Sequence, residues 1–162
     1  MSADKSPYRI VLIEPEIPGN TGSIARTCAG TGTALHLVEP LGFSLEDKYI
    51  RRAGLDYWPR VDLTVHPSFD DVLKRTGKGR VWLFTKRAEK TLWDVDYEPG
   101  DHLVFGCETR GLPPELLARY PDSRLRIPIT DGVRSLNLAN AANVVLFEAL
   151  RQCGFSPPAH DL

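Results

Sequence analysis

The stretch RIPITDGVRSLNLANAANVVLFEALRQCG, residues 126–154, links the end of an expected strand to an expected amphipathic helix. Between these elements lies TDGVRSLNLAN, which is crowded with small and polar side chains. A connection that only turns the chain needs a glycine and a residue that caps the helix. The additional Asp, Arg, Ser and Asn side chains indicate that this loop holds something at the mouth of the last helix.

The rest of the chain alternates between expected strands and expected helices. Between the apolar runs, Asn20 and Ser68 are expected to cap helices and Gly54 to end one. This alternation predicts an α/β fold with a mostly parallel sheet flanked by helices. The expected strands cover residues 8–14, 34–39, 60–66, 80–85, 102–106 and 123–129, and the expected helices cover 21–30, 45–54, 67–77, 113–120 and the segment before Gly154.

The composition is that of an ordinary globular protein. The 162 residues are 42% hydrophobic and 25% charged, which suits one domain over residues 1–162, with 1–7 and 156–162 expected to be flexible. A net charge of -1 argues against a protein that coats nucleic acid in general, but leaves room for a local basic patch. No apolar run reaches the roughly 20 residues that span a bilayer, and residues 1–14 lack the apolar stretch of a signal peptide.

Cysteine and histidine are sparse. Cys28, Cys107 and Cys153 form no CxxC pair and are odd in number, which is typical of reduced thiols in a cytoplasm. The 4 histidines show no paired ligand spacing, so we expect no metal site. These features predict a cytoplasmic protein that is not associated with a membrane.

Three loops stand out at the expected carboxyl edge of the sheet, where parallel α/β folds bind their ligands. Their sequences are EPEIPGNTGSIAR, GCETRGLPPE and ITDGVRSLN, and each carries a single arginine: Arg26, Arg110 or Arg134. Neither GxGxxG nor GxxxxGK[ST] occurs, so a dinucleotide fingerprint and a P-loop are not indicated. The three loops therefore predict a ligand site of another kind.

The same loops carry a family resemblance. NTGSIAR, FGCETRGLP and IPITDGVRSLNLANAANVVLFEA resemble motifs one, two and three of the SPOUT RNA methyltransferases, in the branch that methylates ribose 2′-hydroxyls. IVLIEPEIPGNTGSIARTCAGTG and LHLVEPLGFSLEDKYIRRAGLDYW are similar to the small bacterial enzymes that methylate the wobble cytidine or uridine of leucine tRNAs. The resemblance covers roughly Tyr8 to Phe155, and three ordered motifs are far more specific than one.

The resemblance implies a fold, a cofactor and partners. In this family the C-terminal third forms a deep trefoil knot, S-adenosylmethionine lies bent in the knot, and the enzyme is a homodimer. The resemblance thus implies S-adenosylmethionine as cofactor with S-adenosylhomocysteine as product, no metal, a second copy of the chain, and the anticodon stem-loop of leucine tRNAs as substrate. TDGVRSLN would hold the adenosyl part through its backbone, while Asn and Ser side chains brace the loops.

The family match also implies cofactor contacts. Ser135, Leu136 and Asn137 match its Ser-Leu-Asn, although Ser135 or Asn137 could instead cap the last helix. Gly106 could let a ligand approach the backbone or simply make a tight turn. Contacts through backbone atoms explain why apolar residues can bind the cofactor. The implied cofactor-binding residues are Phe84, Thr85, Gly106, Glu108, Gly111, Ile127, Ser135, Leu136 and Asn140.

The implied reaction is an in-line attack of a ribose oxygen on a sulfonium methyl group, which needs positioning and loss of a proton but no metal. Asn20 and Arg26 have the Asn-x5-Arg spacing of the family's first motif. The pKa of arginine, above about 12, makes it a poor base, so we assign Arg26 to orienting the hydroxyl and its phosphate. Without the match it would be a surface ion-pair residue. Glu108 is the alternative acid–base candidate, or a brace for its own loop. The implied catalytic residues are Arg26, Ser135, Asn20 and Glu108.

Further side chains could contact RNA or a second copy. Tyr57 and Trp58 could stack on an anticodon base, although core packing is the simpler explanation. Segment 86–100, KRAEKTLWDVDYEPG, matches the family only weakly and could shape the substrate edge. A stripe on the last helix, Leu138, Ala142, Val145 and Ala149, should be core and in part available to a dimer. Phosphate contacts are expected from Lys48, Arg51, Arg52, Arg110 and Arg134.

Two other functions stay open. A sister enzyme would act on ribosomal RNA or on another tRNA position, and a non-catalytic module would bind RNA on the same fold. No RNA-binding extension flanks the motifs, which favours the small wobble enzyme. Intact Arg26, Glu108 and Ser135 favour an enzyme over a binding module.

Overall fold

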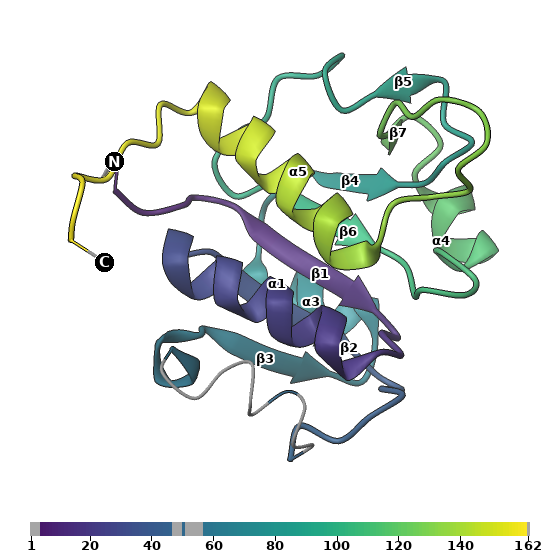
Figure 1. Ribbon diagram of the computed structural model, residues 1–162. Helices are drawn as coiled ribbons and strands as arrows, with labels where there is room; N and C mark the ends of the chain where they lie inside the picture. Colours follow the sequence, from purple (N-terminus) through teal and green to yellow (C-terminus); the bar gives the residue numbers. More distant parts are fainter. Residues whose placement is uncertain (1–3, 47–49, 51–56, 162) are drawn as a thin grey trace.

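A single seven-stranded sheet organises the described part of the chain, and all its strand pairs are parallel. The computed structural model describes residues 4–46, 50 and 57–161. The strand order is β3-β2-β1-β6-β4-β7-β5 (Figure 1). The strands are β1 (Arg9–Ile13), β2 (Ala34–Val38), β3 (Leu63–His66), β4 (Val81–Phe84), β5 (Lys90–Thr91), β6 (His102–Phe105) and β7 (Arg124–Arg126).

Helices cover both faces of this sheet, which is why its strands are apolar on both sides. Successive side chains of β1 alternate between two cores: Ile10 and Leu12 face α1 and α5, whereas Val11 and Ile13 face α3 and α4. In Figure 1, α1 and α5 lie side by side on one face. The helices are α1 (Pro18–Thr31), α3 (Phe69–Thr76), α4 (Pro114–Arg119) and α5 (Leu138–Gln152), and a 3-10 turn, η1, spans Trp58–Arg60.

The last strand is enclosed by an earlier part of the chain. Leu125 of β7 pairs with Phe84 of β4 on one side and with Lys90 of β5 on the other. Because Phe84 and Lys90 pair with the same residue from opposite sides, the short connection between them has to cross over the carboxyl end of β7. The chain that leaves β7 passes this connection before it enters α5, and this brings the stretch 127–137 against the ends of β4 and β6.

The predicted stripe on the last helix is core. Ala142, Val145 and Ala149 are fully buried, and the hydroxyl of Tyr8 donates to the carbonyl of Ala149 at 3.0 Å. The opposite face of α5 exposes Val144 and Phe147, which are 45% and 52% accessible. The helix thus has one apolar face in the core and a second one exposed.

Several predicted boundaries need correction. The last strand ends at Arg126 and not at 129, because Pro128 has no N–H for a ladder and residues 127–129 turn toward the pocket described below. The third strand begins at Leu63 because η1 occupies the preceding residues. Strand β5 was not predicted, since two residues leave too short a pattern. The expected helix over 45–54 falls largely outside the described residues.

The chain termini differ in how they are held. The expected flexible start, residues 1–7, is too long at its inner end: Ser6 is buried, and its N–H donates to the carbonyl of Thr31 at 2.8 Å. Residues 156–161 are exposed or half-buried and belong to no helix or strand. Ser68 caps α3 as predicted, accepting from the N–H of Asp71 at 3.2 Å. Across the described residues, no helix is both long enough and apolar enough to cross a membrane.

Candidate active site

A cavity of about 870 Å³ opens at the carboxyl ends of β4, β6 and β7, beside the start of α5. Its volume lies within the roughly 300–1,000 Å³ of small-molecule sites. Arg26 and Asn140 are not among the residues that line it. The other predicted site residues do line it, namely Asn20, Phe84, Thr85, Gly106, Glu108, Gly111, Ile127, Ser135 and Leu136.

The floor of this pocket is apolar. The rings of Phe84 and Phe105 stack with centroids 4.9 Å apart and planes at 12°, and both are largely buried. Ile127 and Leu138 extend the apolar surface. Such a floor suits a flat heteroaromatic group whose edges are bound by polar atoms of the surrounding loops.

Glu108 ties the second loop to the start of α1. Its carboxylate accepts from the N–H groups of Glu16 and Ile17, at 2.9 and 2.8 Å, and from the side-chain amide of Asn20 at 3.1 Å. The prediction that Asn20 caps this helix is wrong. The helix begins at Pro18, a favoured first position, and its N-cap residue Ile17 has no side-chain cap, while Glu108 accepts from the two N–H groups that precede Pro18.

Glu16 returns this contact in the opposite direction. Its carboxylate accepts from the N–H of Thr109 at 3.0 Å and from the Thr109 hydroxyl at 2.7 Å. These two hydrogen bonds hold the pKa of the Glu16 carboxyl below its usual value. Glu16 and Glu108 therefore form a reciprocal clasp between the first and second loops, so Glu108 braces a neighbouring loop more than its own.

Asn137 joins the third loop to the same network. Its side-chain oxygen accepts from the N–H groups of Ala139 and Asn140, at 2.9 and 3.3 Å, and its amide donates to the side-chain oxygen of Asn20 at 3.0 Å. Of the two candidates for the cap of the last helix, Asn137 is therefore the one that serves. The chain of contacts Asn137–Asn20–Glu108 connects all three loops.

The stretch between β7 and Asn137 offers its own backbone to a ligand. No backbone–backbone hydrogen bond recorded for the described loops involves residues 127–136. Ser135 is exposed, makes no recorded hydrogen bond and lines the pocket. Because backbone N–H and C=O groups need partners, a loop of this kind is suited to bind polar edges of a ligand through its main chain.

Gly106 is required by its own loop. A Cβ at this position would lie 2.0 Å from the carbonyl carbon of Gly111 and 2.2 Å from the nitrogen of Leu112. The N–H of Gly111 donates to the carbonyl of Cys107 at 3.0 Å, and Gly111 has a φ of 71°. Of the two explanations, the tight turn accounts for this glycine, and the turn in turn forms one wall of the pocket.

Arg26 stands apart from the pocket, on the exposed side of α1. Its guanidinium lies over the ring of Tyr57, 5.5 Å from the ring centroid. The Tyr57 hydroxyl donates to the carbonyl of Gly22 at 3.1 Å, and burial raises the pKa of this phenol. Tyr57 and Trp58 pack against the core, as the simpler explanation predicted.

Cations line the rim of the pocket. Arg110 and Arg134 do so as predicted, and Lys86 and Arg87 do so without having been predicted, because segment 86–100 matched the family only weakly. Lys48, Arg51 and Arg52 lie outside the described residues. Within the part of the chain that the structure describes, no three His, Cys, Asp or Glu side chains gather as a possible metal site.

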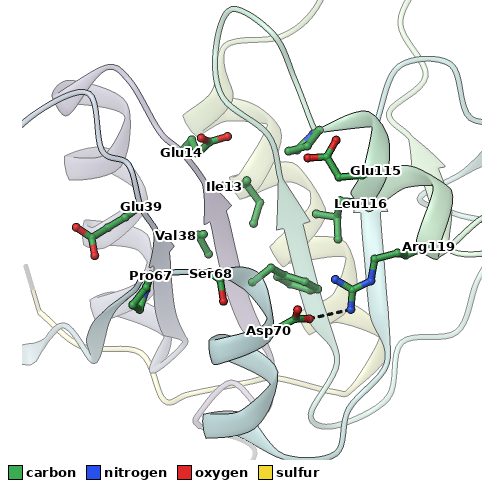
Figure 2. A pocket seen from close by; sticks show the side chains of 12 residues that line it. Ile13, Glu14, Val38, Glu39, Pro67, Ser68, Asp70, Glu115, Leu116 and Arg119 are labelled. Carbon is green, nitrogen blue, oxygen red and sulfur yellow. Dashed lines mark hydrogen bonds and ion pairs between the residues drawn. The ribbon is translucent and has the colours of Figure 1, made fainter.

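A second, smaller hollow lies at the carboxyl ends of β1 and β2, on the α3 and α4 side of the sheet. Its volume is about 250 Å³. Figure 2 shows four carboxylates around it, with Arg119 paired to Asp70 at 2.8 Å. The acidic side chains are Glu14, Glu39, Asp70 and Glu115.

These features define an α/β domain with a pocket of small-molecule size where three interlocked loops meet the carboxyl edge of its sheet. Residues 7–147 match the SpoU rRNA Methylase family, and the chain belongs to that family. It is therefore a methyltransferase. The fold class, including the knotted C-terminal segment that SpoU-type structures carry, is confirmed.

Individual relatives agree with this assignment. The chain is 50% identical over 151 residues to the tRNA (cytidine(34)-2'-O)-methyltransferase of Burkholderia pseudomallei, covering 91% of this chain and 97% of that one. It is 48% identical, with a TM-score of 0.86, to a structure described as "Structural insights into the 2-OH methylation of C/U34 on tRNA", covering 91% and 98%. An AdoMet-bound rRNA methyltransferase from Sinorhizobium meliloti is 28% identical with a TM-score of 0.80, covering 92% of this chain and 59% of that one.

Proposed function

We propose that this chain transfers a methyl group from S-adenosylmethionine to the ribose 2′-hydroxyl of nucleotide 34, the wobble cytidine or uridine, of leucine tRNAs. Relatives that match over nearly their whole length carry this position in their names. The observation that carries the proposal is the network Asn137–Asn20–Glu108, which brings the three family loops to one pocket. A tRNA substrate, exposed loops and free cysteines all fit a protein of the cytoplasm.

The wide pocket fits S-adenosylmethionine, which supplies an electrophilic methyl group when bound. The apolar floor to which Phe84 and Phe105 contribute suits adenine. The unpaired backbone of residues 127–136 offers donors and acceptors for the edges of the adenine and ribose. Ser135 adds a hydroxyl at the same wall. Ile127 and Leu136 can contribute through their main chain alone.

The roles of the residues that would face the methyl-accepting ribose follow from the hydrogen bonds that these residues already make. The Glu108 carboxylate accepts three hydrogen bonds, two of them from backbone N–H groups, so its structural engagement makes it a positioning residue rather than a free base. Asn20 is fixed between Glu108 and Asn137 and can hold the wall next to the reacting oxygen. We infer that the proton of the ribose hydroxyl leaves to the adjoining phosphate or to solvent. Arg26 orients the hydroxyl and the phosphate.

Arg26 needs a second copy of the chain to reach such a site. It lies six residues beyond Asn20 on α1, about 9 Å along the helix axis, and does not line its own pocket. The exposed stripe of Val144 and Phe147 on the neighbouring helix α5 supplies an apolar surface for association. We therefore propose a homodimer that packs through α1 and α5 and places Arg26 at the partner's pocket.

Purified protein, S-adenosylmethionine and unmodified transcripts of leucine tRNAs test this function. Mass spectrometry of nuclease digests should find one 2′-O-methyl group, at nucleotide 34, and light scattering should give a dimer. Phe147→Glu should shift the protein toward monomer and remove activity without removing S-adenosylhomocysteine binding. Ribosomal RNA fragments serve as the competing substrate. Methylation of these fragments and not of tRNA would refute the proposal and favour the sister activity.

A further inference from the structure

The most exposed large hydrophobic side chain of the described residues belongs to Trp93, at 65%. It lies in segment 86–100, and the indole itself belongs neither to the core nor to the lining of the cofactor pocket. The neighbouring Leu92 is 1% exposed and sits in the core. Exposing an indole of this size costs hydrophobic stabilisation that burial would provide, so its position calls for an explanation.

The turn around Trp93 is held firmly. Asp94 accepts from the N–H and the hydroxyl of Thr91, at 2.7 and 3.1 Å, and the Thr91 hydroxyl accepts from the N–H of Trp93 at 3.2 Å. Leu92 donates its N–H to the carbonyl of Arg126 at 2.9 Å, and its own carbonyl accepts from the hydroxyl of Tyr97 at 2.8 Å. The backbone on both sides of the indole is thus fixed, and little entropy is lost when a partner packs on it.

The position of Trp93 follows from the sheet. The wide pocket is lined by residues at the carboxyl ends of β6, β4 and β7, and β5 is the next strand outward (Figure 1). Because β5 runs parallel to β7, Trp93, two residues past its end, lies at the same edge of the sheet as the pocket. Two strand spacings, about 10 Å, separate the line of β5 from that of β4.

Three cations lie between Trp93 and the pocket, with the exposed Glu89 among them. Lys86 and Arg87 line the pocket rim, and Lys90 precedes Trp93 on β5. No hydrogen bond or ion pair joins these three side chains to another of the described residues. The nearby Asp94 carboxylate is engaged by Thr91, and that engagement holds its pKa below the usual value.

We propose that Trp93 is a stacking platform for an unpaired base of the substrate RNA loop, with Lys86, Arg87 and Lys90 contacting the phosphates between that base and the reacting nucleotide. An exposed aromatic ring on a well-held backbone, with cations along the same edge of the sheet, is the combination that binds single-stranded RNA. The inference rests on the proposed function, because it presumes that the reacting nucleotide lies at the wide pocket.

The test measures RNA affinity by fluorescence anisotropy, using a labelled anticodon stem-loop with cytidine at the wobble position. Trp93→Ala should raise the Kd by at least about fivefold, whereas Trp93→Phe should keep most of the affinity. Replacing loop bases one at a time by abasic sites should find one position at which Trp93→Ala has no further effect, since the stack is already lost. S-adenosylhomocysteine affinity should stay unchanged in both variants.

Charge is tested with a matched pair. Lys90→Gln should weaken RNA binding and reduce its salt dependence, whereas Lys74→Gln, an equal loss of charge on the far side of the sheet, should do neither. If the wild type binds and methylates the RNA but Trp93→Ala binds equally well, the stacking role is wrong while the proposed function stands. A change from dimer to monomer in Trp93→Ala would instead assign Trp93 to the contact between copies and overturn the proposal. No binding of any RNA by the wild type would refute both.

Discussion

The two hollows at the carboxyl edge of the sheet differ in what surrounds them. The wide pocket is walled by irregular loops, by a glycine turn and by a main chain whose polar groups are not paired with each other. The acidic hollow of Figure 2 lies among the ends of regular elements, with the Asp71 N–H bonded to the Ser68 hydroxyl and its single arginine paired with Asp70.

Both hollows arise because parallel strands end at a common edge, yet only one has the means to bind a nucleoside. The acidic hollow, at about 250 Å³, falls below the usual size of a ligand site, and its carboxylates repel phosphate. The wide pocket has both the volume and free backbone groups. A hollow at a strand end is therefore not enough, and unsatisfied main-chain groups distinguish the two.

The largest effect is expected from Arg26, which lies outside both hollows. Arg26→Ala should cut single-turnover methyl transfer by about a hundredfold or more, a loss of roughly 2.7 kcal/mol in transition-state stabilisation. Arg26→Lys should restore little, since a point charge does not reproduce the planar fork. Calorimetry should find S-adenosylhomocysteine affinity within a few-fold of normal in both. Near-normal turnover of Arg26→Ala would make this residue an ordinary surface arginine.

Gly106→Ala tests the wall of the wide pocket. The new Cβ would overlap the backbone of Gly111 and Leu112, so the turn has to move. We expect a loss of roughly 1.4–2.7 kcal/mol, seen as a tenfold to hundredfold drop in S-adenosylhomocysteine affinity. Gly30→Ala on α1 is the matched control, because its Cβ would meet no atom within 4 Å. Equal behaviour of the two variants would show that the turn does not shape the pocket.

Neutralising one carboxylate at each hollow compares the stability contribution of a carboxylate bonded to backbone N–H groups with that of an exposed ion pair. Glu108→Gln turns an amide toward N–H donors and should lower the free energy of unfolding by about 1.5–3 kcal/mol. Asp70→Asn breaks only an exposed pair and should cost about 0–1 kcal/mol. Urea denaturation at pH 7.5 measures both. If Asp70→Asn lowered the free energy of unfolding more than Glu108→Gln, the clasp formed by Glu16 and Glu108 would not stabilise the loops.

A pH dependence of stability is expected on the side of the acidic hollow. His36 and His66 are buried, with Nδ1 of the first 2.9 Å from Nε2 of the second. Burial, with help from His66 and His102, lowers the pKa of His36 from 6.5 to about 4. Between these values the unfolded chain binds a proton that the folded chain does not, so stability should fall as the pH drops from about 6.5 to 4. His36→Gln should flatten this slope in urea titrations, and an unchanged slope would contradict the assignment.

The sequence predicted the alternation, the α/β class and most of the pocket lining, because apolar periodicity and the motif words are local signals. It could not predict which loop supplies hydrogen-bond partners to which other loop. Glu108 accepts from the N–H groups just before α1 although it lies in another loop, and Asn137 reaches Asn20 across 117 positions. The assignment of Asn20 as a cap failed for this reason, since Pro18 moved the helix start upstream. Glu16 and Trp93 were missed because a clasp and an exposed indole leave no pattern in a single sequence.

Hydrogen exchange with and without S-adenosylhomocysteine tests the central claim most directly, since it compares the two hollows in one experiment. The account predicts that the ligand protects amides in residues 106–111 and 127–137 around the wide pocket. Amides in residues 66–71 and 113–119, around the acidic hollow, should exchange at unchanged rates. Protection confined to the second set, or absent from both at saturating ligand, would contradict the assignment of the cofactor to the wide pocket.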